Sequence, residues 1–294
     1  MYLIIGANGY LGSYVIKNIL EKTEDDIIAT ARDIATCEQN NRITWVKCEV
    51  TDKEDVDNLS ELTAKNTEVK VVYLAAYHKP DMVQKNPKIA WNINITALSN
   101  MINQLVNIKC LFYASTDSVY GSSVNRYHFK EEDCLKPENI YGRQKQTAEA
   151  VVTGYGYNVV RYPFLIGTSL LKKKRHFYDE IVAQIKAGKS FDMFEDSYRS
   201  SLDFNTAAGL LIELMETYEE EYPQILNISG DEDLSKYDVG IRVAEKENCA
   251  TALIHPIRMN EKTGIFTAPR ATSTLMDNSR VKRLLGLSEI KLQL

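Results

Sequence analysis

The first 22 residues place a short apolar run, a glycine-rich turn and an amphipathic segment in direct succession. Residues 1–5 have the length and composition of a buried strand, and the turn GANGYLG follows at residues 6–12. Apolar residues then recur at helical spacing through about residue 22: Leu11, Val15, Ile16, Ile19 and Leu20. A strand, a glycine turn and a helix in this order predict a nucleotide-binding α/β architecture.

Each glycine of the turn has a separate physical task in such an architecture. Gly6 permits the tight turn after the strand, and Gly9 lets the backbone approach a pyrophosphate at the positive end of the helix. Gly12 allows the helix to pack closely on the strand. We therefore expect this turn to bind a dinucleotide through six residues: Gly6, Asn8, Gly9, Tyr10, Leu11 and Gly12.

The rest of the first half alternates apolar strands with helical segments. Strands are predicted at residues 27–29, 43–50, 69–76, 109–114 and 157–161, and helices at residues 52–64 and 87–107. This rhythm predicts an α/β fold with a Rossmann-type, doubly wound parallel sheet. Beyond it the pattern is less regular. We therefore divide the chain into a dinucleotide-binding domain, residues 1–163, and a smaller C-terminal substrate-binding lobe, residues 164–294, of which about 203–230 is expected to pack back on the first domain.

Arg32 stands where the adenosine ribose of a bound dinucleotide is expected, twenty residues after Gly12. An acidic residue there would bind the ribose 2′-hydroxyl, whereas an arginine can meet a 2′-phosphate. Asp33 beside it keeps NAD(H) open as the alternative, and Arg32 could also be a solvated loop residue. We expect NADP(H) as the preferred cofactor.

Two predicted strands end in side chains that suit a cofactor cleft, because ligands bind at the carboxyl ends of parallel strands. Val50 closes the first of these strands and is expected to flank the adenine. The second closes with Leu74, Ala75 and Ala76, and small residues at this point admit a cofactor.

Hydroxyl groups and an ammonium group are expected to meet at the same edge of the sheet. Ser115 and Thr116 follow the strand at 109–114, and Tyr141 and Lys145 are four residues apart, on one helix face. The pKa of a phenol in water is about 10, and a neighbouring ammonium lowers it toward the range of acid/base catalysis. We therefore predict Thr116, Tyr141 and Lys145 as catalytic residues.

Composition excludes several other classes of function. The chain has 35 Lys and Arg against 40 Asp and Glu, a net charge of −5, which does not favour a nucleic-acid-binding surface. The five cysteines form no CxxC pair and the histidines lack metal-ligand spacing, so no metal site is predicted. No signal-peptide pattern or membrane-length apolar run is found. We expect a soluble, cytoplasmic protein without a nucleic-acid or membrane partner.

The glycine turn, the strand end at 74–76, Thr116 and the Tyr141–Lys145 pair together resemble the extended short-chain dehydrogenase/reductase family, over nearly the whole chain. Within that family, the chain is similar to dTDP-4-dehydrorhamnose reductases and related sugar-nucleotide 4-keto reductases. Segments 227–237 and 269–280 carry this finer likeness.

The resemblance implies an NAD(P)-dependent reductase of a nucleotide-activated 4-keto sugar. Tyr141 would protonate the oxygen of the reduced carbonyl, Thr116 would hydrogen-bond the same oxygen, and Lys145 would hold the nicotinamide ribose. Two alternatives stay open: a sugar-nucleotide 4-epimerase that retains NAD tightly, and a non-catalytic nucleotide-sensing subunit. Ser118 stands where related dehydratases have a glutamate, which disfavours a dehydratase.

The resemblance also implies a contact between Pro163 and the cofactor, and a set of substrate-binding residues: Asp117, Ser118, Arg199 and Arg270. His78 is added to this set because it follows the predicted strand at 69–76, near the cleft. Arg199 is expected to bind the substrate diphosphate or to form a structural ion pair, and His78 to contact substrate or to be a hydrogen-bonded structural histidine.

The basic run at 172–175 is predicted to begin a helix and to be a solvated turn, with attraction of a nucleotide diphosphate as the alternative. The predicted partner is a nucleotide-sugar substrate. A homodimer stays open, because an apolar helix face looks alike in a core and in an interface.

Overall fold

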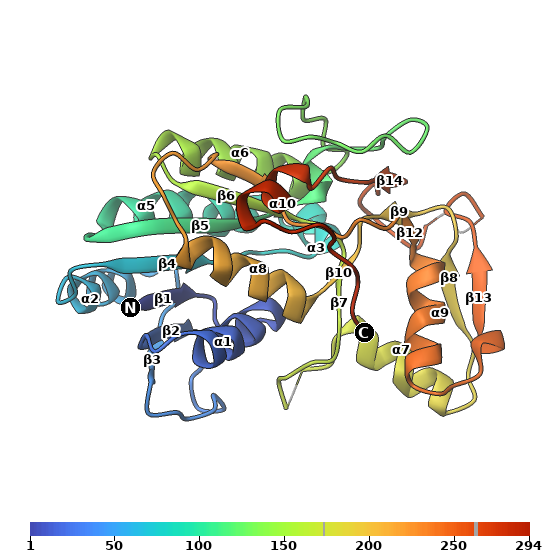
Figure 1. Cartoon of the computed structure of the whole chain (residues 1–294), viewed down its shortest axis with the longest axis horizontal. Helices are drawn as coiled ribbons and strands as arrows, with labels where there is room; N and C mark the ends of the chain where they lie inside the picture. Colours follow the sequence, from blue (N-terminus) through green and yellow to red (C-terminus); the bar gives the residue numbers. More distant parts are fainter. Residues whose placement is uncertain (173, 262–263) are drawn as a thin grey trace.

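A computed structural model of the chain describes residues 1–172, 174–261 and 264–294 (Figure 1). Within these ranges the main body is a seven-stranded parallel sheet with the strand order β11-β6-β5-β4-β1-β2-β3. Its strands are β1 (Tyr2–Ile5), β2 (Ile27–Ala31), β3 (Ile43–Lys47), β4 (Val69–Tyr73), β5 (Ile108–Thr116), β6 (Asn158–Tyr162) and β11 (Ile225–Asn227). The predicted Rossmann-type fold is confirmed.

Helices cover both faces of this sheet, as a doubly wound fold requires. Helices α1 (Tyr10–Lys22) and α8 (Phe204–Glu216) pack on one face, together with Tyr2 and Ile4 of β1. The other face carries α2 (Lys53–Thr63), α5 (Ala97–Gln104) and α6 (Ile140–Gly154). Successive residues of β1 alternate between the two cores, which explains why the strand is apolar throughout.

Two predicted elements differ from the structure in their bounds. The strand expected at 43–50 ends at Lys47, and the Asp55 carboxylate then accepts a hydrogen bond of 2.7 Å from the Glu49 backbone N–H. That bond holds the chain in the turn that leads to α2. The helix expected at 87–107 consists of α4 (Pro87–Trp91), a π-helical turn η1 (Asn92–Thr96) and α5.

The second half of the chain builds a smaller lobe, on the right of Figure 1. Helices α7 (Phe177–Lys186) and α9 (Lys236–Lys246) share a core with the parallel pair β8 (Phe191–Phe194) and β13 (Ile254–Ile257). Helix α7 begins at Phe177 and not within the basic run, because His176 and Asp179 form a capping box there. Lys173 of the basic run lies outside the described residues.

Short strands connect this lobe to the main body. Strand β9 (Tyr198–Arg199) lies between β12 (Leu234–Ser235) and β14 (Ser273–Thr274), and β7 (Leu165–Ile166) pairs with β10 (Leu202–Asp203). The last helix, α10 (Ser279–Leu285), contributes Val281 to the core under α1 and α8.

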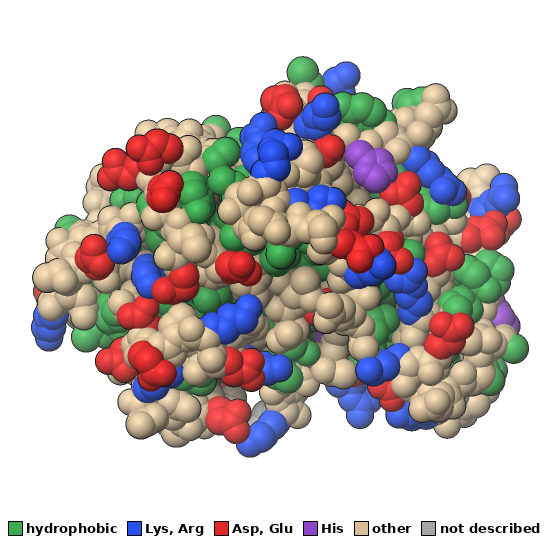
Figure 2. Space-filling view, in the orientation of Figure 1, with side chains coloured by type: hydrophobic (Ala, Val, Ile, Leu, Met, Phe, Trp, Pro, Cys, Tyr) green, Lys and Arg blue, Asp and Glu red, His purple; other side chains and the backbone are tan. Residues whose placement is uncertain are grey.

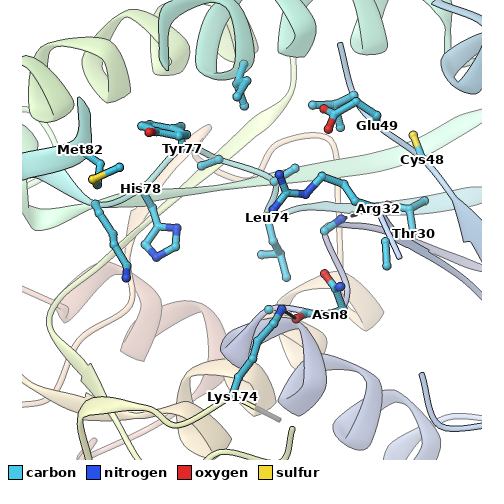
Figure 3. A pocket seen from close by; sticks show the side chains of 18 residues that line it. Asn8, Thr30, Arg32, Cys48, Glu49, Leu74, Tyr77, His78, Met82 and Lys174 are labelled. Atoms are coloured by element: carbon cyan, nitrogen blue, oxygen red, sulfur yellow. Dashed lines mark hydrogen bonds between the residues drawn. The ribbon is translucent and has the colours of Figure 1, made fainter. Parts of the chain in front are cut away.

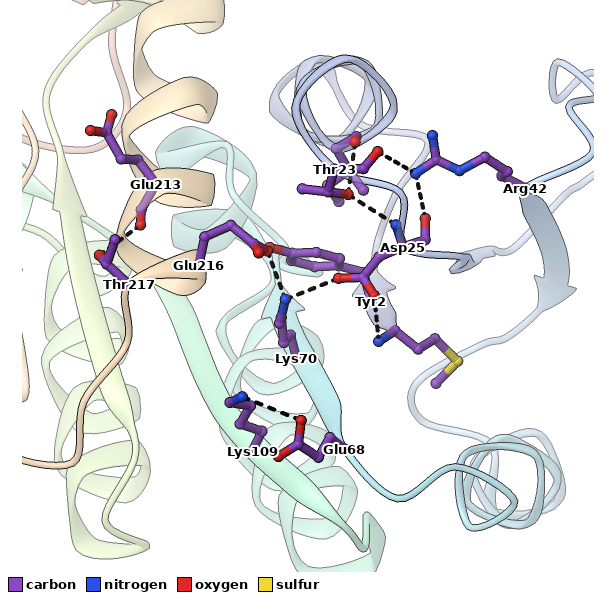
Figure 4. A network of polar contacts seen from close by, with 12 residues as sticks. Tyr2, Thr23, Asp25, Arg42, Glu68, Lys70, Lys109, Glu213, Glu216 and Thr217 are labelled. Atoms are coloured by element: carbon purple, nitrogen blue, oxygen red, sulfur yellow. Dashed lines mark hydrogen bonds and ion pairs between the residues drawn. The ribbon is translucent and has the colours of Figure 1, made fainter.

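Parts of the second half also return to the main sheet. Strand β11 pairs with β6, and α8 packs along α1. At the end of α8, Glu216 accepts hydrogen bonds from the Tyr2 hydroxyl and, at 2.7 Å, from the Lys70 ammonium (Figure 4). The same ammonium reaches Asp25 at 2.9 Å. Segment 203–230 thus lies against the first part of the chain.

On the face shown in Figure 2, acidic and basic side chains are interspersed over both parts of the molecule. In the portion of the chain that the structure describes, no helix combines the length and the apolar character needed to cross a membrane.

Candidate active site

The carboxyl edge of the sheet brings together the strand ends that the sequence singled out. Tyr73 at the end of β4 lies opposite Tyr113 of β5, and Thr116 at the end of β5 lies opposite Tyr162 of β6. Leu74 and Ala114, which directly follow Tyr73 and Tyr113, therefore lie at the same edge of the sheet. Ligands of doubly wound sheets bind at this edge.

A cavity of about 390 Å³ opens above the glycine turn (Figure 3). Nine of the predicted site residues line it: Gly6, Asn8, Gly9, Arg32, Val50, Leu74, Ala75, Ala76 and His78. They come from the turn after β1 and from the segments that follow β2, β3 and β4. Residues distant in the sequence therefore surround one volume, large enough for part of a dinucleotide.

The glycine turn has the geometry expected of it. Gly6 has a φ of 88°, a left-handed conformation that favours glycine, and its N–H donates to the Thr30 hydroxyl at 3.0 Å. A Cβ atom on Gly12 would lie 2.4 Å from the Ala7 carbonyl oxygen, so only glycine allows this approach of helix to strand. The sequence did not single out Thr30, whose hydroxyl and carbonyl both hold the turn.

Charged side chains around the cavity are mostly basic. Arg32, Lys79 and Lys174 line it, with Glu49 as the acidic residue among the described lining side chains. Asp33 is not among the lining residues, and its carboxylate accepts a hydrogen bond of 2.9 Å from the Ala35 N–H in its own turn. A cavity with this charge suits a ligand that carries phosphate groups.

Thr116 and Tyr141 do not line this cavity, and their side chains lie close enough for the Thr116 hydroxyl to favour a lower pKa of the Tyr141 phenol. Thr116 Oγ1 also lies 3.1 Å from an Asp117 carboxylate oxygen. Burial, together with the negative charge of Asp117, raises the pKa of the Tyr141 phenol above its ordinary value. Tyr141 is therefore a neutral phenol at neutral pH, the form that donates a proton.

Lys145 is buried and contacts the strand beneath it. Its ammonium donates to the Tyr113 hydroxyl at 2.9 Å and to the Ala114 carbonyl at 2.7 Å. Burial lowers the pKa of Lys145 to about 7, against the opposing charge of Glu149. The expected lowering of the Tyr141 pKa by Lys145 is wrong for this structure, because burial of the phenol and the charge of Asp117 act in the opposite direction.

Asp117 connects the candidate catalytic residue Thr116 to the second half of the chain. Its carboxylate accepts a hydrogen bond from the Thr274 hydroxyl and lies 3.2 Å from Nε of Arg199. The guanidinium of Arg199 also donates to three backbone carbonyls, those of Tyr198, Ala271 and Thr272. Arg199 is thus held by an ion pair and by the backbone, the structural alternative considered for it.

The other predicted residues take several positions. Arg270 is paired with Asp81 at 2.6 Å, and Ser118 Oγ lies 3.4 Å from an Asp117 carboxylate oxygen. His78 lines the cavity and is exposed there.

Six predicted cofactor contacts lie outside the described lining: Tyr10, Leu11, Gly12, Tyr141, Lys145 and Pro163. The Tyr10 ring packs on His176 and Phe204, the Leu11 side chain packs on the core under α1, and Pro163 is buried between β6 and β7.

Lys236 is a charged residue near Asp117 that sequence reasoning missed. Its ammonium lies 4.9 Å from the centroid of the Phe164 ring, and no ion pair is found for it among the described residues. Burial and the positive charge of Arg199 lower its pKa to about 8. Its place in a segment of family likeness, 227–237, was the available signal, but spacing alone does not bring it near residues 117 and 199.

Comparison with known proteins assigns the family. The family model of the RmlD substrate binding domain matches residues 1–293. The chain belongs to this family. Membership confirms the resemblance to dTDP-4-dehydrorhamnose reductase-like members of the extended short-chain dehydrogenases/reductases.

The proteins similar to this chain include a subunit of a methionine adenosyltransferase, a reductase and an epimerase. Methionine adenosyltransferase 2 subunit beta of Danio rerio is 26% identical over 292 residues, 97% of this chain and 85% of that protein. The dTDP-4-dehydrorhamnose reductase of Bacillus anthracis, solved with NADP, is similar with a TM-score of 0.80 at 21% identity, over 99% of this chain and 94% of that one. The UDP-glucuronic acid 4-epimerase of Bacillus cereus, solved with UDP-glucuronic acid and NAD, has a TM-score of 0.81 at 17% identity and the same coverages, 99% and 94%. The two solved structures share the fold of the RmlD-family chain.

Proposed function

We propose that the protein is an NADP(H)-dependent reductase of a nucleotide-activated 4-keto sugar. The observation that carries this proposal is that Thr116 and Tyr141 lie side by side, with Lys145 on the same helix as Tyr141, at the sheet edge that also holds the cavity. The family and the NADP- and NAD-bound neighbours with the same fold support it.

The described residues fit a nicotinamide dinucleotide. The turn at Gly6 and Gly9 opens on the cavity, and Arg32 lines it where the adenosine ribose is expected. Bound there, the nicotinamide would supply the hydride for carbonyl reduction.

The chain itself would supply the proton and hold the carbonyl oxygen. Tyr141, a neutral phenol, is the donor, and Thr116 provides a second hydrogen bond to the oxygen that becomes negative. Lys145, on the same helix as Tyr141, has a pKa near neutrality, so it could return a proton or, as an ammonium, hold the nicotinamide ribose.

The test is NADPH oxidation with a panel of nucleotide-activated 4-keto sugars. Wild type should oxidise NADPH with at least one of them, and Tyr141→Phe should lose roughly 10²–10⁴ of that rate while it binds NADPH normally. Tyr155→Phe is the matched control, because Tyr155 is exposed just after the same helix. Near-normal turnover in Tyr141→Phe contradicts the assignment.

A 4-epimerase would use the same residues but retain its cofactor. The absorption spectrum of freshly purified protein separates the two: a tightly held dinucleotide favours the epimerase, and a site that fills only on addition of NADPH favours the reductase.

A second candidate function is that of a partner subunit without its own turnover. The observation that favours it is the likeness to the beta subunit of a methionine adenosyltransferase over 97% of the chain. This candidate predicts that the protein co-purifies with a methionine adenosyltransferase and changes its rate. Absence of NADPH oxidation with every sugar of the panel, together with such a complex, would replace the first proposal by this one.

A further inference from the structure

A segment of the second half lies across the start of α1, beside the glycine turn. We call it the crossing; its contacts with α1 and the turn come from Thr168, Lys174, Arg175 and His176. The Tyr14 hydroxyl donates to the Thr168 carbonyl at 2.9 Å, and the Tyr10 hydroxyl donates to the Arg175 carbonyl at 2.6 Å. The Tyr10 and His176 rings meet edge to face with centroids 4.8 Å apart. Two tyrosines of α1 therefore fix both ends of this crossing.

Lys174 in this crossing reaches the cavity. Its ammonium donates to the Asn8 carbonyl of the glycine turn at 2.9 Å, and its side chain lines the cavity together with Gly6 and Gly9 (Figure 3). An ammonium has three N–H donors, so two remain for a ligand. No ion pair to Lys174 is found in the described part of the chain, and its charge is therefore not neutralised there by an acidic neighbour.

Lys172, two residues earlier, is exposed, lies near an acidic side chain and is outside the cavity lining. Lys172 lies 3.8 Å from Glu38, and both side chains are highly exposed, at 86% and 84%. It does not line the cavity. The basic run thus combines a solvated residue, as the sequence predicted, with one that faces the dinucleotide cavity.

We propose that Lys174 binds a phosphate of the dinucleotide, so that residues far along the chain complete a site built mainly by residues 6–78. The inference rests on the proposed use of a nicotinamide dinucleotide and adds a residue to its site. An ammonium beside a glycine turn and a helix N-terminus is suited to a phosphate oxygen, because all three groups favour negative charge at the same place.

The position favours the pyrophosphate over the ribose 2′-phosphate. Lys174 is bonded to Asn8 of the turn, next to the helix end that attracts a pyrophosphate, whereas Arg32 follows β2 where the adenosine ribose is expected. Both NADPH and NADH contain a pyrophosphate, and only NADPH has the 2′-phosphate, so the two cofactors distinguish these sources of negative charge.

The experiment measures the dissociation constants of NADPH and NADH by fluorescence titration and calorimetry, for wild type, Lys174→Gln, Lys174→Arg and Lys172→Gln. We expect Lys174→Gln to weaken binding of both cofactors roughly 10-fold or more, because a charge-assisted hydrogen bond is lost. Lys174→Arg should restore most of the affinity, and Lys172→Gln should match wild type. Melting temperatures of the cofactor-free variants check that the fold is intact.

Each outcome decides the inference. Loss for both cofactors places Lys174 at the pyrophosphate, and loss for NADPH alone places it at the 2′-phosphate; both support a phosphate-binding lysine. Unchanged affinity in Lys174→Gln with a lowered melting temperature means that Lys174 only anchors the crossing, and it overturns the inference while the proposed function stands. Failure of wild type to bind either cofactor overturns both.

Discussion

The Arg161 guanidinium and the Glu149 carboxylate form a buried ion pair, with 2.6 Å between Nη2 and Oε2. Arg161 also donates to the Tyr120 hydroxyl at 2.8 Å, and Glu149 accepts a hydrogen bond from Ser115. Ser115 precedes Thr116 on β5, and Glu149 follows Lys145 by one turn of α6. The pair therefore joins the strand and the helix that carry the candidate catalytic residues.

Removal of one partner should destabilise the fold strongly. Arg161→Met leaves the Glu149 carboxylate buried and unpaired, and we expect the free energy of unfolding to fall by about 3–5 kcal/mol. Urea unfolding measures this change. The double variant with Glu149→Gln should lose less than the sum of the single variants, since neither charge is then left alone. Lys53→Met, which removes a pair on the surface of α2, is the control and should leave the unfolding midpoint nearly unchanged.

Lys145 should reduce the stability of the cofactor-free protein near neutral pH. Its pKa is lowered from the ordinary lysine value to about 7 by burial, so between about pH 7 and the unfolded value near 10.5 the unfolded chain binds more protons than the folded one. The free energy of unfolding of the wild type therefore increases as pH rises through that window. Lys145→Met lacks the buried charge, and we expect a higher melting temperature than wild type at pH 7.

The advantage of Lys145→Met should shrink as pH approaches 10, because protonation of Lys145 then stabilises the unfolded wild-type chain less and less. Melting curves at pH 7, 8, 9 and 10 measure the difference directly. A difference that stays constant over this range would show that lost packing, and not ionisation, determines the effect.

Arg32 should determine the choice between cofactors. It lines the cavity after β2, while the Asp33 carboxylate is bonded within its own turn. Arg32→Ala is expected to weaken NADPH binding roughly 10-fold or more, because a charge-assisted contact to the 2′-phosphate is lost. NADH affinity in the same variant is the internal control and should change much less. Equal losses for both cofactors would contradict a contact with the 2′-phosphate.

A methyl group on Gly12 should disturb both the fold and the dinucleotide site. Its Cβ would lie 2.4 Å from the Ala7 carbonyl oxygen, so α1 must move away from the turn. We expect Gly12→Ala to lose about 1–3 kcal/mol in the free energy of unfolding and to bind dinucleotide more weakly. Gly154→Ala is the matched control, since a Cβ there meets no atom within 4 Å. It should leave stability unchanged or raise it by up to about 1 kcal/mol.

Local patterns were sufficient to predict the sheet and half of the residues that line the cavity. The apolar run before Gly6, the helical spacing after it and the short segments after β3 and β4 that hold Val50 and Leu74 depend on neighbours in the sequence. Side chains at the ends of parallel strands then meet at one edge whatever the loops do. For this reason nine predicted residues line one cavity.

Contacts between distant segments were not predictable in this way. Lys174 lies in a basic run whose composition predicts a solvated turn. The packing of the second half on Tyr10 and Tyr14 brings this lysine to Asn8. The Tyr141 pKa depends likewise on burial and on Asp117, neither of which is visible in the spacing of Tyr141 and Lys145. The sequence pattern suggested Lys145 as the partner of the Tyr141 phenol, whereas the folded environment decides whether the pKa of that phenol is raised or lowered.

The pairing of β11 with β6 also bears on how the protein is made. Strand β11 ends at Asn227, so a ribosome completes residues 158–162 more than sixty residues before their sheet partner exists. During that interval β6 of the nascent chain has one unpaired edge, a site at which strands of other chains can add. Protection of this edge before residue 227 emerges is a requirement that the finished structure places on the cell.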